Sequence, residues 1–323
     1  MDKSVVLISP DFFNLSTIIK EEIEKQGYKC KWFDDRPSNK LLAKMLLRLS
    51  SSFLKGKINR YFDSIIEYCK KEQPSKFIVI IGQCFNTKHY QKLRKELPNM
   101  ELVFYNWDSI ENFPITKDNF TFFDRSYSFD LTDCKKYNID FLPLFYSYQS
   151  SNVKEDLDYS IITTVKKGKY ADLHSIISQL DKKYSNKFAH LYLQFKSMFN
   201  YYKISDKGFK LAKKEEFTTE RLSADKVQDV FNRSKIIVDI VMAKQSGLTI
   251  RTIDTLHLKK KLITNNFNIK EYPFYTEQNI LVCKDGDKID FNSKFFKEPF
   301  DDKYCIDETY SLTSFVKKLL GEK

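Results

Sequence analysis

A short polar loop between two apolar segments holds the residues whose types best suit the binding of a phosphate group. Residues 236–241 form an apolar run interrupted only by Asp239, and residues 250–258 carry apolar side chains at the spacing of one helix face. A loop that leads from a strand into a helix points backbone N–H groups and the positive end of the helix dipole at one spot. That spot suits a phosphate or diphosphate, although a plain strand–helix turn has the same composition. The loop residues concerned are Ser246, Gly247, Leu248 and Thr249.

Basic residues lie close to the expected strand ends. Arg251 falls in the first turn of the expected helix, where it either pairs with a phosphate or serves as a surface charge. Lys166 and Lys169 belong to a Lys-Lys-Gly-Lys turn that follows the expected strand 159–165. Loops after the strands of a doubly wound sheet face the ligand crevice. We therefore expect one of the two lysines to contact an anionic ligand, with a solvated lysine turn as the alternative.

Two aspartates of the first half follow expected strands in the same way. Asp108 comes after Trp107 and the apolar run 101–105, and Asp11 comes after the first apolar run, 3–9. Either carboxylate could act as a general base that deprotonates a substrate hydroxyl group. Capping of the following helix is the commoner role of a loop aspartate and is the alternative for both.

Metal ligands are sparse in the sequence. The four histidines have no ligand spacing, and the six cysteines are scattered without a Cys-x-x-Cys pair. Asp285 and Asp287 flank a glycine between two strand-like runs, 279–283 and 288–291, which indicates a hairpin turn rather than a cation site. We expect no obligatory metal and no bound cofactor, and the cysteine pattern is typical of a reducing cytosol.

The composition is that of a two-domain globular protein with a basic surface. The 323 residues exceed the usual size of one domain, and 42% of them are hydrophobic. No apolar run is long enough to span a membrane, and the run within residues 1–10 is too short for a secretion signal. The net charge of +11 fits three kinds of anionic partner: a nucleic acid, a membrane surface or a phosphorylated small molecule.

The densest basic segment is residues 40–60, where leucines are interspersed with lysines and arginines. Such a segment suits an anionic membrane surface, because its apolar side chains enter the lipid while its cations meet the headgroups. An ordinary surface helix with a solvated basic face is the alternative. We do not expect a nucleic-acid partner, because the sequence has neither a helix-turn-helix pattern nor the aromatic motif of RNA-recognition domains.

Apolar runs and amphipathic segments alternate along the chain, which predicts an α/β protein with doubly wound parallel sheets. The polar segment 146–158 divides the pattern into two similar halves, 1–150 and 151–323, which we expect to form two Rossmann-like domains facing a central cleft. A terminal helix over 311–320 either stays with the second half or packs back on the first. The expected strands span 3–9, 28–33, 77–81, 101–105, 121–129 and 140–144 in the first half, and 159–165, 189–193, 236–241, 262–264 and 278–282 in the second.

This organisation and two segments resemble the GT-B glycosyltransferases, and more narrowly the cytosolic sugar transferases of bacterial capsule and lipopolysaccharide clusters. The first segment is 234–265, which contains the loop and helix described above. The second is Tyr105-Asn-Trp-Asp-Ser-Ile-Glu-Asn-Phe-Pro114, followed by 123–133 and by Phe141-Leu-Pro-Leu-Phe145. Together with the order of elements, the resemblance covers nearly the whole chain.

The resemblance implies roles for the candidate residues. Retaining GT-B enzymes usually carry two glutamates eight positions apart at the loop–helix junction, one for the sugar and one for the donor ribose. Ser246 and Asp254 hold these places here, so Asp254 would bind the ribose, whereas Ser246 departs from the pattern. Lys166 or Lys169 would stabilise the charge that develops on the nucleoside diphosphate leaving group.

We therefore expect a cytoplasmic glycosyltransferase, peripheral on the inner face of the membrane. It would move a sugar from a nucleotide-sugar donor, held by the second half, to a lipid-linked or polysaccharide acceptor, held by the first. Another enzyme of nucleotide-linked substrates, such as an epimerase or a polyol-phosphate transferase, is one alternative. A basic nucleic-acid-binding protein without catalytic activity is the other.

Overall fold

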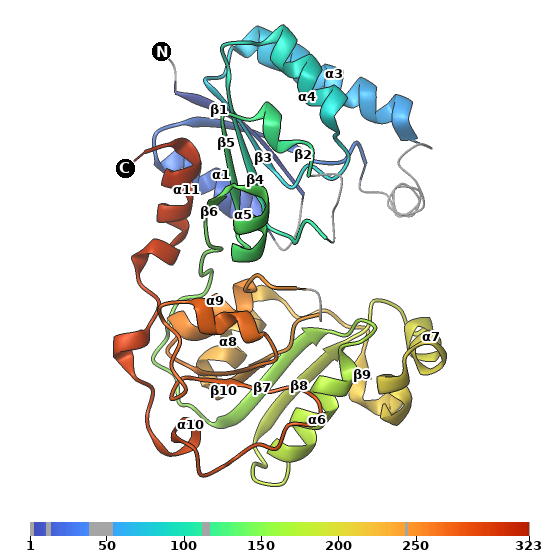
Figure 1. The fold of residues 1–323 in the computed structure, drawn as a ribbon, viewed down its shortest axis with the longest axis vertical. Coiled ribbons are helices and arrows are strands. Elements are labelled where there is room, and N and C mark those ends of the chain that lie inside the picture. Colours follow the sequence, from blue (N-terminus) through green and yellow to red (C-terminus); the bar gives the residue numbers. More distant parts are fainter. Residues whose placement is uncertain (1–2, 11–13, 39–53, 112–116, 243–244, 323) are drawn as a thin grey trace. The chain divides into compact units, whose positions relative to one another are not determined.

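The computed structural model describes residues 3–10, 14–38, 54–111, 117–242 and 245–322. The chain forms two compact units, each with its own sheet and helices (Figure 1). Unit 1 comprises residues 1–143 together with 312–323, and unit 2 comprises residues 144–311. Each unit has a six-stranded sheet whose paired strands all run parallel. The chain is thus an α/β protein with two Rossmann-like, doubly wound units, and the predicted fold class is confirmed.

The sheet of unit 1 has the strand order β2-β1-β3-β4-β5-β6. Its central strands are apolar throughout because helices cover both faces of the sheet. The chain adds β2 on one side of β1 and then adds β3 on the other, so the direction of winding reverses between β1 and β3. The strands are β1 (Ser4–Ser9), β2 (Lys29–Asp34), β3 (Lys76–Ile80), β4 (Glu101–Asn106), β5 (Arg125–Ser128) and β6 (Asp140–Phe141).

Helices α3 (Lys55–Glu72) and α4 (Thr87–Glu96) pack on one face of this sheet, where Phe62, Tyr90 and Leu93 contact the apolar side chains of β1, β3 and β4. The last helix, α11, packs on unit 1: the ring of Phe315 lies 4.8 Å from that of Tyr105. The other helical elements are α1 (Leu15–Lys25), η3 (Phe120–Phe122), α5 (Leu131–Tyr137) and α11 (Leu312–Leu320).

The guanidinium of Arg125 holds α11 in place by hydrogen bonds to its last carbonyls. It donates to the carbonyl oxygens of Lys318 at 2.7 Å and Leu319 at 2.9 Å. At the other end of α11, the hydroxyl of Thr313 donates to Glu22 of α1 at 2.8 Å. The two Arg125 bonds satisfy carbonyl groups in the last turn of α11, where the helix itself has no donors for them.

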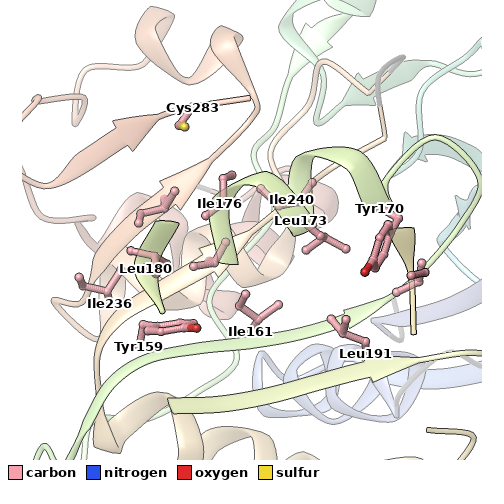
Figure 2. Close-up of a cluster of buried hydrophobic side chains, with 14 of the residues drawn as sticks. Tyr159, Ile161, Tyr170, Leu173, Ile176, Leu180, Leu191, Ile236, Ile240 and Cys283 are labelled. Carbon is pink, nitrogen blue, oxygen red and sulfur yellow. The ribbon is translucent and has the colours of Figure 1, made fainter. Parts of the chain in front are cut away.

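The sheet of unit 2 has the strand order β12-β11-β10-β7-β8-β9, and its winding reverses between β7 and β10. Figure 2 shows the core beneath it, in which Tyr159 and Ile161 of β7 pack against Leu173 and Ile176 of α6. The strands are β7 (Leu157–Thr164), β8 (Lys187–Tyr192), β9 (Phe217–Thr218), β10 (Ser234–Asp239), β11 (Lys261–Thr264) and β12 (Ile280–Val282). The principal helices are α6 (Tyr170–Leu180), α7 (Ser197–Ser205), α8 (Ala224–Arg233), α9 (Ile250–His257) and α10 (Lys294–Lys297). The 3-10 turns are η4 (Lys207–Leu211), η5 (Lys214–Glu216), η6 (Phe267–Glu271), η7 (Asp302–Tyr304) and η8 (Glu308–Tyr310).

Two details differ from the sequence-based expectations. The expected strand 121–129 begins as η3 and is extended only over β5. The expected hairpin around Gly286 is only a turn, because residues 288–291 form no strand. The side chain of Gln179 in α6 accepts from the N–H of Ile289 and donates to the carbonyl of Asp287, both at 2.9 Å. The backbone after the turn therefore bonds to a helix side chain instead of pairing with β12.

The polar segment 146–158 bonds to unit 2 along much of its length. The N–H of Ser151 donates to Asn232 of α8 at 2.9 Å, and the Nδ2 of Asn232 donates to the carbonyl of Gln149 at 3.1 Å. Residues 157 and 158 already belong to β7. The segment thus forms an ordered part of the second unit.

Candidate functional site

The reversal of winding between β7 and β10 marks the place in unit 2 where a ligand is expected. In open parallel α/β sheets, ligands bind outside the carboxyl ends of the strands at the point where the strand order reverses. Two loops leave the sheet there: one runs from β7 to α6 through Lys169, and the other runs from β10 to α9 through residues 245–249.

Asp239, the last residue of β10, is the centre of a charged cluster at this point. Its carboxylate is 1% exposed and accepts hydrogen bonds from Arg251 Nε at 3.0 Å, from Thr252 Oγ1 at 2.9 Å and from the Thr249 hydroxyl. Burial by itself raises the pKa of Asp239, but Arg251, Lys169 and these donors lower it overall. The carboxylate is therefore a fixed negative charge. Sequence reasoning missed this role, although a single acid that ends an apolar run is a readable signal.

Lys169 is the second charged partner in the cluster. It lies just before α6, is 5% exposed, and its Nζ donates to Thr163 Oγ1 of β7 at 2.6 Å. Burial, helped by the nearby charge of Arg251 and opposed by that of Asp239, lowers the pKa of Lys169 to about 7. Arg251 thus pairs with the buried carboxylate, and Lys169 lies within electrostatic range of both groups. The surplus of positive charge favours an anionic ligand when Lys169 is protonated.

The two lysines proposed from the sequence have different surroundings. Lys169 is buried beside the carboxylate of Asp239, whereas Lys166 is exposed at the start of the turn. The turn itself closes through a hydrogen bond from the N–H of Lys169 to the carbonyl of Lys166 at 3.2 Å. Of the two, only Lys169 lies within the buried charged cluster.

The side chain of an asparagine that follows β11 holds the loop before α9 in place by hydrogen bonds. Asn266 donates to the carbonyl oxygens of Ser246 and Gly247, both at 3.2 Å, and the side chain of Leu248 is buried. Thr249 is the N-cap of α9 and accepts from the N–H of Thr252 at 3.1 Å. Because Thr249 also bonds to Asp239, the positive end of α9 lies at the same cluster as Lys169 and Arg251.

Asp254 lies further along α9 and is bonded to the start of unit 2. Its carboxylate accepts from the backbone N–H groups of Ser147 at 2.6 Å and Tyr148 at 3.0 Å, and from the Ser147 hydroxyl at 3.1 Å. Burial raises its pKa to about 7, and these hydrogen bonds oppose the shift. A ribose hydroxyl that bonded to Asp254 would share the carboxylate with these donors.

One of the two candidate residues of unit 1, Asp108, lies just after the end of a strand. Asp108 is half-buried after β4; its Oδ1 accepts from the N–H of Ser109 at 2.8 Å, and its carbonyl accepts from Asn106. Asp11, the other proposed base, lies outside the described residues. Trp107, which precedes Asp108, is also half-buried.

A buried ion pair that sequence reasoning missed lies at the same edge of this sheet. Asp35 follows β2, is fully buried, and lies 3.2 Å from Nε of Arg36. Its other oxygen accepts from the N–H of Gln83, which follows β3, at 3.2 Å. Gly82 has a φ of +66°, and a Cβ there would lie 2.6 Å from the Tyr90 hydroxyl. The chain thus makes a close turn that brings Gln83 to Asp35 across the end of β1.

Neither a metal cluster nor a membrane span is found in the parts of the chain that the structure describes. No group of three or more histidine, cysteine, aspartate or glutamate side chains could hold a metal ion there. None of the described helices is long and apolar enough to cross a bilayer.

The sequence matches no protein-family model and no curated protein. Solved structures nevertheless share the architecture over almost the whole chain. Sucrose-phosphate synthase of Thermosynechococcus elongatus is 8% identical with a TM-score of 0.62, over 99% of this chain and 94% of that one. HepE of Anabaena, solved with UDP and glucose, is 8% identical with a TM-score of 0.57, over 99% and 96%. UDP-GlcNAc 2-epimerase of Methanocaldococcus jannaschii, solved with UDP-GlcNAc and UDP, is 10% identical with a TM-score of 0.55, over 98% of both chains.

The chain has the GT-B fold. At these identities the likeness concerns the fold alone.

Proposed function

We propose that this protein is a glycosyltransferase that moves a sugar from a nucleotide-sugar donor to a lipid-linked or polysaccharide acceptor in bacterial surface glycan synthesis. The observation that carries the proposal is the cluster of Lys169, Arg251 and Asp239 at the strand reversal of unit 2. Two cations and a helix N-terminus beside one carboxylate suit the diphosphate of a nucleotide donor. The solved neighbours that hold UDP or UDP-sugars add support from the fold.

In this proposal the donor binds at the carboxyl edge of the second sheet. Ser246, Gly247, Leu248 and Thr249 line the diphosphate at the start of α9, and Asp254 contacts the ribose. Lys169 and Arg251, with Lys166 at the rim, stabilise the negative charge that develops on the leaving diphosphate. Because protein cations supply this charge, transfer needs no obligatory metal ion and no other cofactor. Activity that persists in a chelator would support this point, and loss restored by magnesium would contradict it.

Unit 1 holds the acceptor in this proposal. Asp108 or Asp11 removes the proton from the acceptor hydroxyl as the new glycosidic bond forms. Asp108→Asn should lower the transfer rate at least about 100-fold while nucleotide binding is retained. An unchanged rate in this variant would leave Asp11 as the proposed base.

We place this activity in the cytoplasm, at the inner face of the membrane, where a lipid-linked acceptor is available. The leucine- and cation-rich segment 40–60 is the proposed contact with anionic lipid, and its residues 40–53 lie outside the described part of the chain. A nucleic-acid partner is not part of the proposal.

Thermal unfolding with nucleotides tests the proposal most directly. The full chain is heated with UDP, GDP, CDP, ADP or CMP, with and without magnesium. A ligand at about 100 times its dissociation constant stabilises the folded state by roughly 2.7 kcal/mol, which raises the melting temperature measurably. A rise with one nucleotide that is lost in Lys169→Met would support the donor site. No rise with any nucleotide would contradict it.

Epimerisation of a nucleotide sugar is the second candidate function, favoured by the likeness to UDP-GlcNAc 2-epimerase. The two reactions give different products from the same donor. A transferase releases nucleoside diphosphate only as the sugar reaches an acceptor, whereas an epimerase changes one stereocentre without needing an acceptor. NMR spectra of the nucleotide sugar, incubated with the protein alone and then with a lipid-linked acceptor, distinguish them.

A further inference from the structure

Between β8 and β9, unit 2 carries an excursion that exposes an unusual amount of apolar surface. Of the seven large hydrophobic side chains that are exposed in the described part of the chain, four lie within residues 195–211. They are Phe195 at 47% exposure, Tyr201 at 57%, Ile204 at 89% and Leu211 at 68%. Tyr201 and Ile204 are three positions apart and share one side of α7. Clustered exposed apolar side chains mark an interaction site more often than single ones do.

The excursion is nevertheless an ordered structure with its own packing. Phe199 and Tyr202, on the opposite side of α7, pack against Phe209. The ring centroid of each lies 5.5 Å from that of Phe209. Nζ of Lys203 donates to the carbonyl of Lys210 at 2.6 Å, which joins α7 to η4. Ile204 and Leu211 each follow one of the two bonded residues in the chain. We call the exposed side chains of residues 195–214 the α7–η4 surface; α7 projects beside β9 in Figure 1.

The same surface is strongly basic and its charges are not neutralised. Five of its lysines are exposed, and none of them forms an ion pair with a carboxylate among the described residues. Many other surface lysines do: Lys70 pairs with Glu96, for example, and Lys92 with Asp63. The one acidic residue within 195–214 is buried Asp206, and the exposed acids Glu215 and Glu216 follow directly after this range. The five lysines are Lys196, Lys207, Lys210, Lys213 and Lys214.

Asp206 ties this surface to the candidate donor site. Its carboxylate accepts from the N–H of Gly168 at 2.6 Å and from the N–H of Gly208 at 3.0 Å. Gly168 lies in the turn that carries Lys166 and Lys169. A Cβ on Gly208 would lie 2.9 Å from Cβ of Ala171, the second residue of α6, so the excursion packs closely on that helix. A ligand of the α7–η4 surface is therefore held close to the donor site of the same unit.

We propose that the α7–η4 surface docks unit 2 on an anionic lipid membrane. Aliphatic and aromatic side chains among unpaired lysines match the boundary between acyl chains and negatively charged headgroups. A second copy of the chain is a poorer occupant, because two such basic surfaces repel. A nucleic acid is also poorer, because the two most exposed apolar side chains of the surface, Ile204 and Leu211, are aliphatic and offer no stacking face to bases.

The proposal of lipid binding depends on the proposed function only for the biological purpose of that binding. Lipid binding is measured without nucleotide and without acceptor, so the two proposals fail separately. The full chain is sedimented with vesicles of phosphatidylcholine alone, and with vesicles of phosphatidylcholine and phosphatidylglycerol in equal parts. We expect it to bind the second kind preferentially and to be released as the salt concentration rises.

Two variants and two matched controls assign the binding to this surface. Removal of the apolar anchors in Ile204→Ser with Leu211→Ser should lower the partition constant at least about tenfold. The control Val153→Ser with Phe267→Ser, which replaces two exposed apolar residues elsewhere in unit 2, should bind as wild type does.

Charge removal by Lys210→Gln, Lys213→Gln and Lys214→Gln should lower binding on the order of 100-fold at low salt. The control Lys154→Gln, Lys288→Gln and Lys303→Gln removes the same charge from exposed sites elsewhere in unit 2 and should have a much smaller effect. Unchanged thermal melting shows that each variant is folded.

Several outcomes would overturn the proposal. Equal binding to both kinds of vesicle, or to neither, would remove the anionic membrane as partner. Wild-type binding by the Ile204 and Leu211 variant would assign the lipid contact to another segment. Self-association that the same variant abolishes would make the surface an interface between two copies. Tighter binding to an oligonucleotide than to vesicles would assign the lysines to nucleic acid.

Discussion

Each unit has a buried aspartate at the carboxyl edge of its sheet, but the pKa values of the two carboxyl groups are shifted in opposite directions. Asp35 in unit 1 has Arg36 beside it and one backbone N–H donor, and burial raises its pKa to about 7. Asp239 in unit 2 has two cations and two threonine hydroxyls around it, and its pKa is lowered despite complete burial. An aspartate at this edge of the sheet can therefore be either a group that titrates near neutral pH or a permanently ionised carboxylate. The cations and hydrogen-bond donors of the neighbouring loops decide which.

The chemical consequence follows from this difference. A carboxylate that stays ionised can hold two cations in place, and the cations can then meet a diphosphate. A carboxyl group that titrates near neutral pH cannot fix a charge in this way, but it can exchange a proton. This contrast is consistent with the proposed assignment of the donor to unit 2, and it can be tested by changing one residue at a time.

The largest effect is expected for Asp239→Asn. It leaves Lys169 and Arg251 without a counter-charge, and breaking a buried ion pair from one side destabilises proteins by about 3–5 kcal/mol. We expect a value toward the lower end, because Arg251 is partly exposed and can reach solvent. Urea unfolding at neutral pH measures the change. Asp254→Asn is the matched control in the same unit, because that carboxylate is equally buried but carries a raised pKa. Equal losses in the two variants would show that hydrogen bonds, not charge, hold the cluster.

The next largest effect is expected for Lys169→Met on nucleotide binding. A charge-assisted hydrogen bond to phosphate contributes about 1.5–3 kcal/mol, so affinity for the nucleoside diphosphate should fall roughly 10- to 100-fold. Isothermal titration calorimetry measures the dissociation constant. Lys167→Met, at an exposed neighbour in the same turn, should have little effect. Wild-type affinity in the Lys169 variant would transfer the proposed role to Lys166 or Arg251.

The pH dependence of nucleotide binding sharpens the same contrast. Burial lowers the pKa of Lys169 to about 7, so the lysine loses its proton as pH rises above this value. A bound diphosphate favours the protonated form of Lys169 and so raises the pH at which the lysine loses its proton. Affinity should therefore fall by up to about tenfold between roughly pH 7.5 and 9.5, above the range where the phosphate itself titrates. The Lys169→Met variant should show a flat profile over this interval, and a parallel decline in that variant would contradict the assignment.

In unit 1, Asp35→Asn is expected to change the pH dependence of stability. The folded pKa of Asp35 is raised, so the folded state holds this proton more tightly than the unfolded chain does. The stability that this proton contributes is fully present below about pH 4 and is lost as pH rises through about 7. The variant has no such proton to lose, so its stability should rise relative to that of wild type over this interval. Denaturant unfolding at a series of pH values measures the difference. A constant difference would mean that Arg36 keeps Asp35 ionised throughout.

The secondary structure was predictable wherever the signal is local. Apolar runs marked the central strands because parallel strands are buried on both faces. The run 77–81, for example, coincides with β3 (Lys76–Ile80) to within one residue at each end. Ser223, a residue type that is preferred at helix N-caps, precedes α8 and accepts from the N–H of Lys226 at 3.2 Å. The hairpin at Gly286 failed because a distant side chain, Gln179, bonds to the backbone that a strand would have used.

The sequence by itself determined the alternation of strands and helices, the Gly/Ser/Thr loop before α9 and the excess of positive charge. These three features follow from local sequence, since the spacing of apolar residues, the capping residues and the charge are all set by residues that are close together in the chain. Only the tertiary structure decided that Lys169, rather than Lys166, lies beside Asp239 and Arg251. That choice depends on β10 pairing with β7, which joins residues 77 positions apart, such as Ile236 and Tyr159. Burial then gives the cluster its altered pKa values, because desolvation and close charges act through space and not along the sequence.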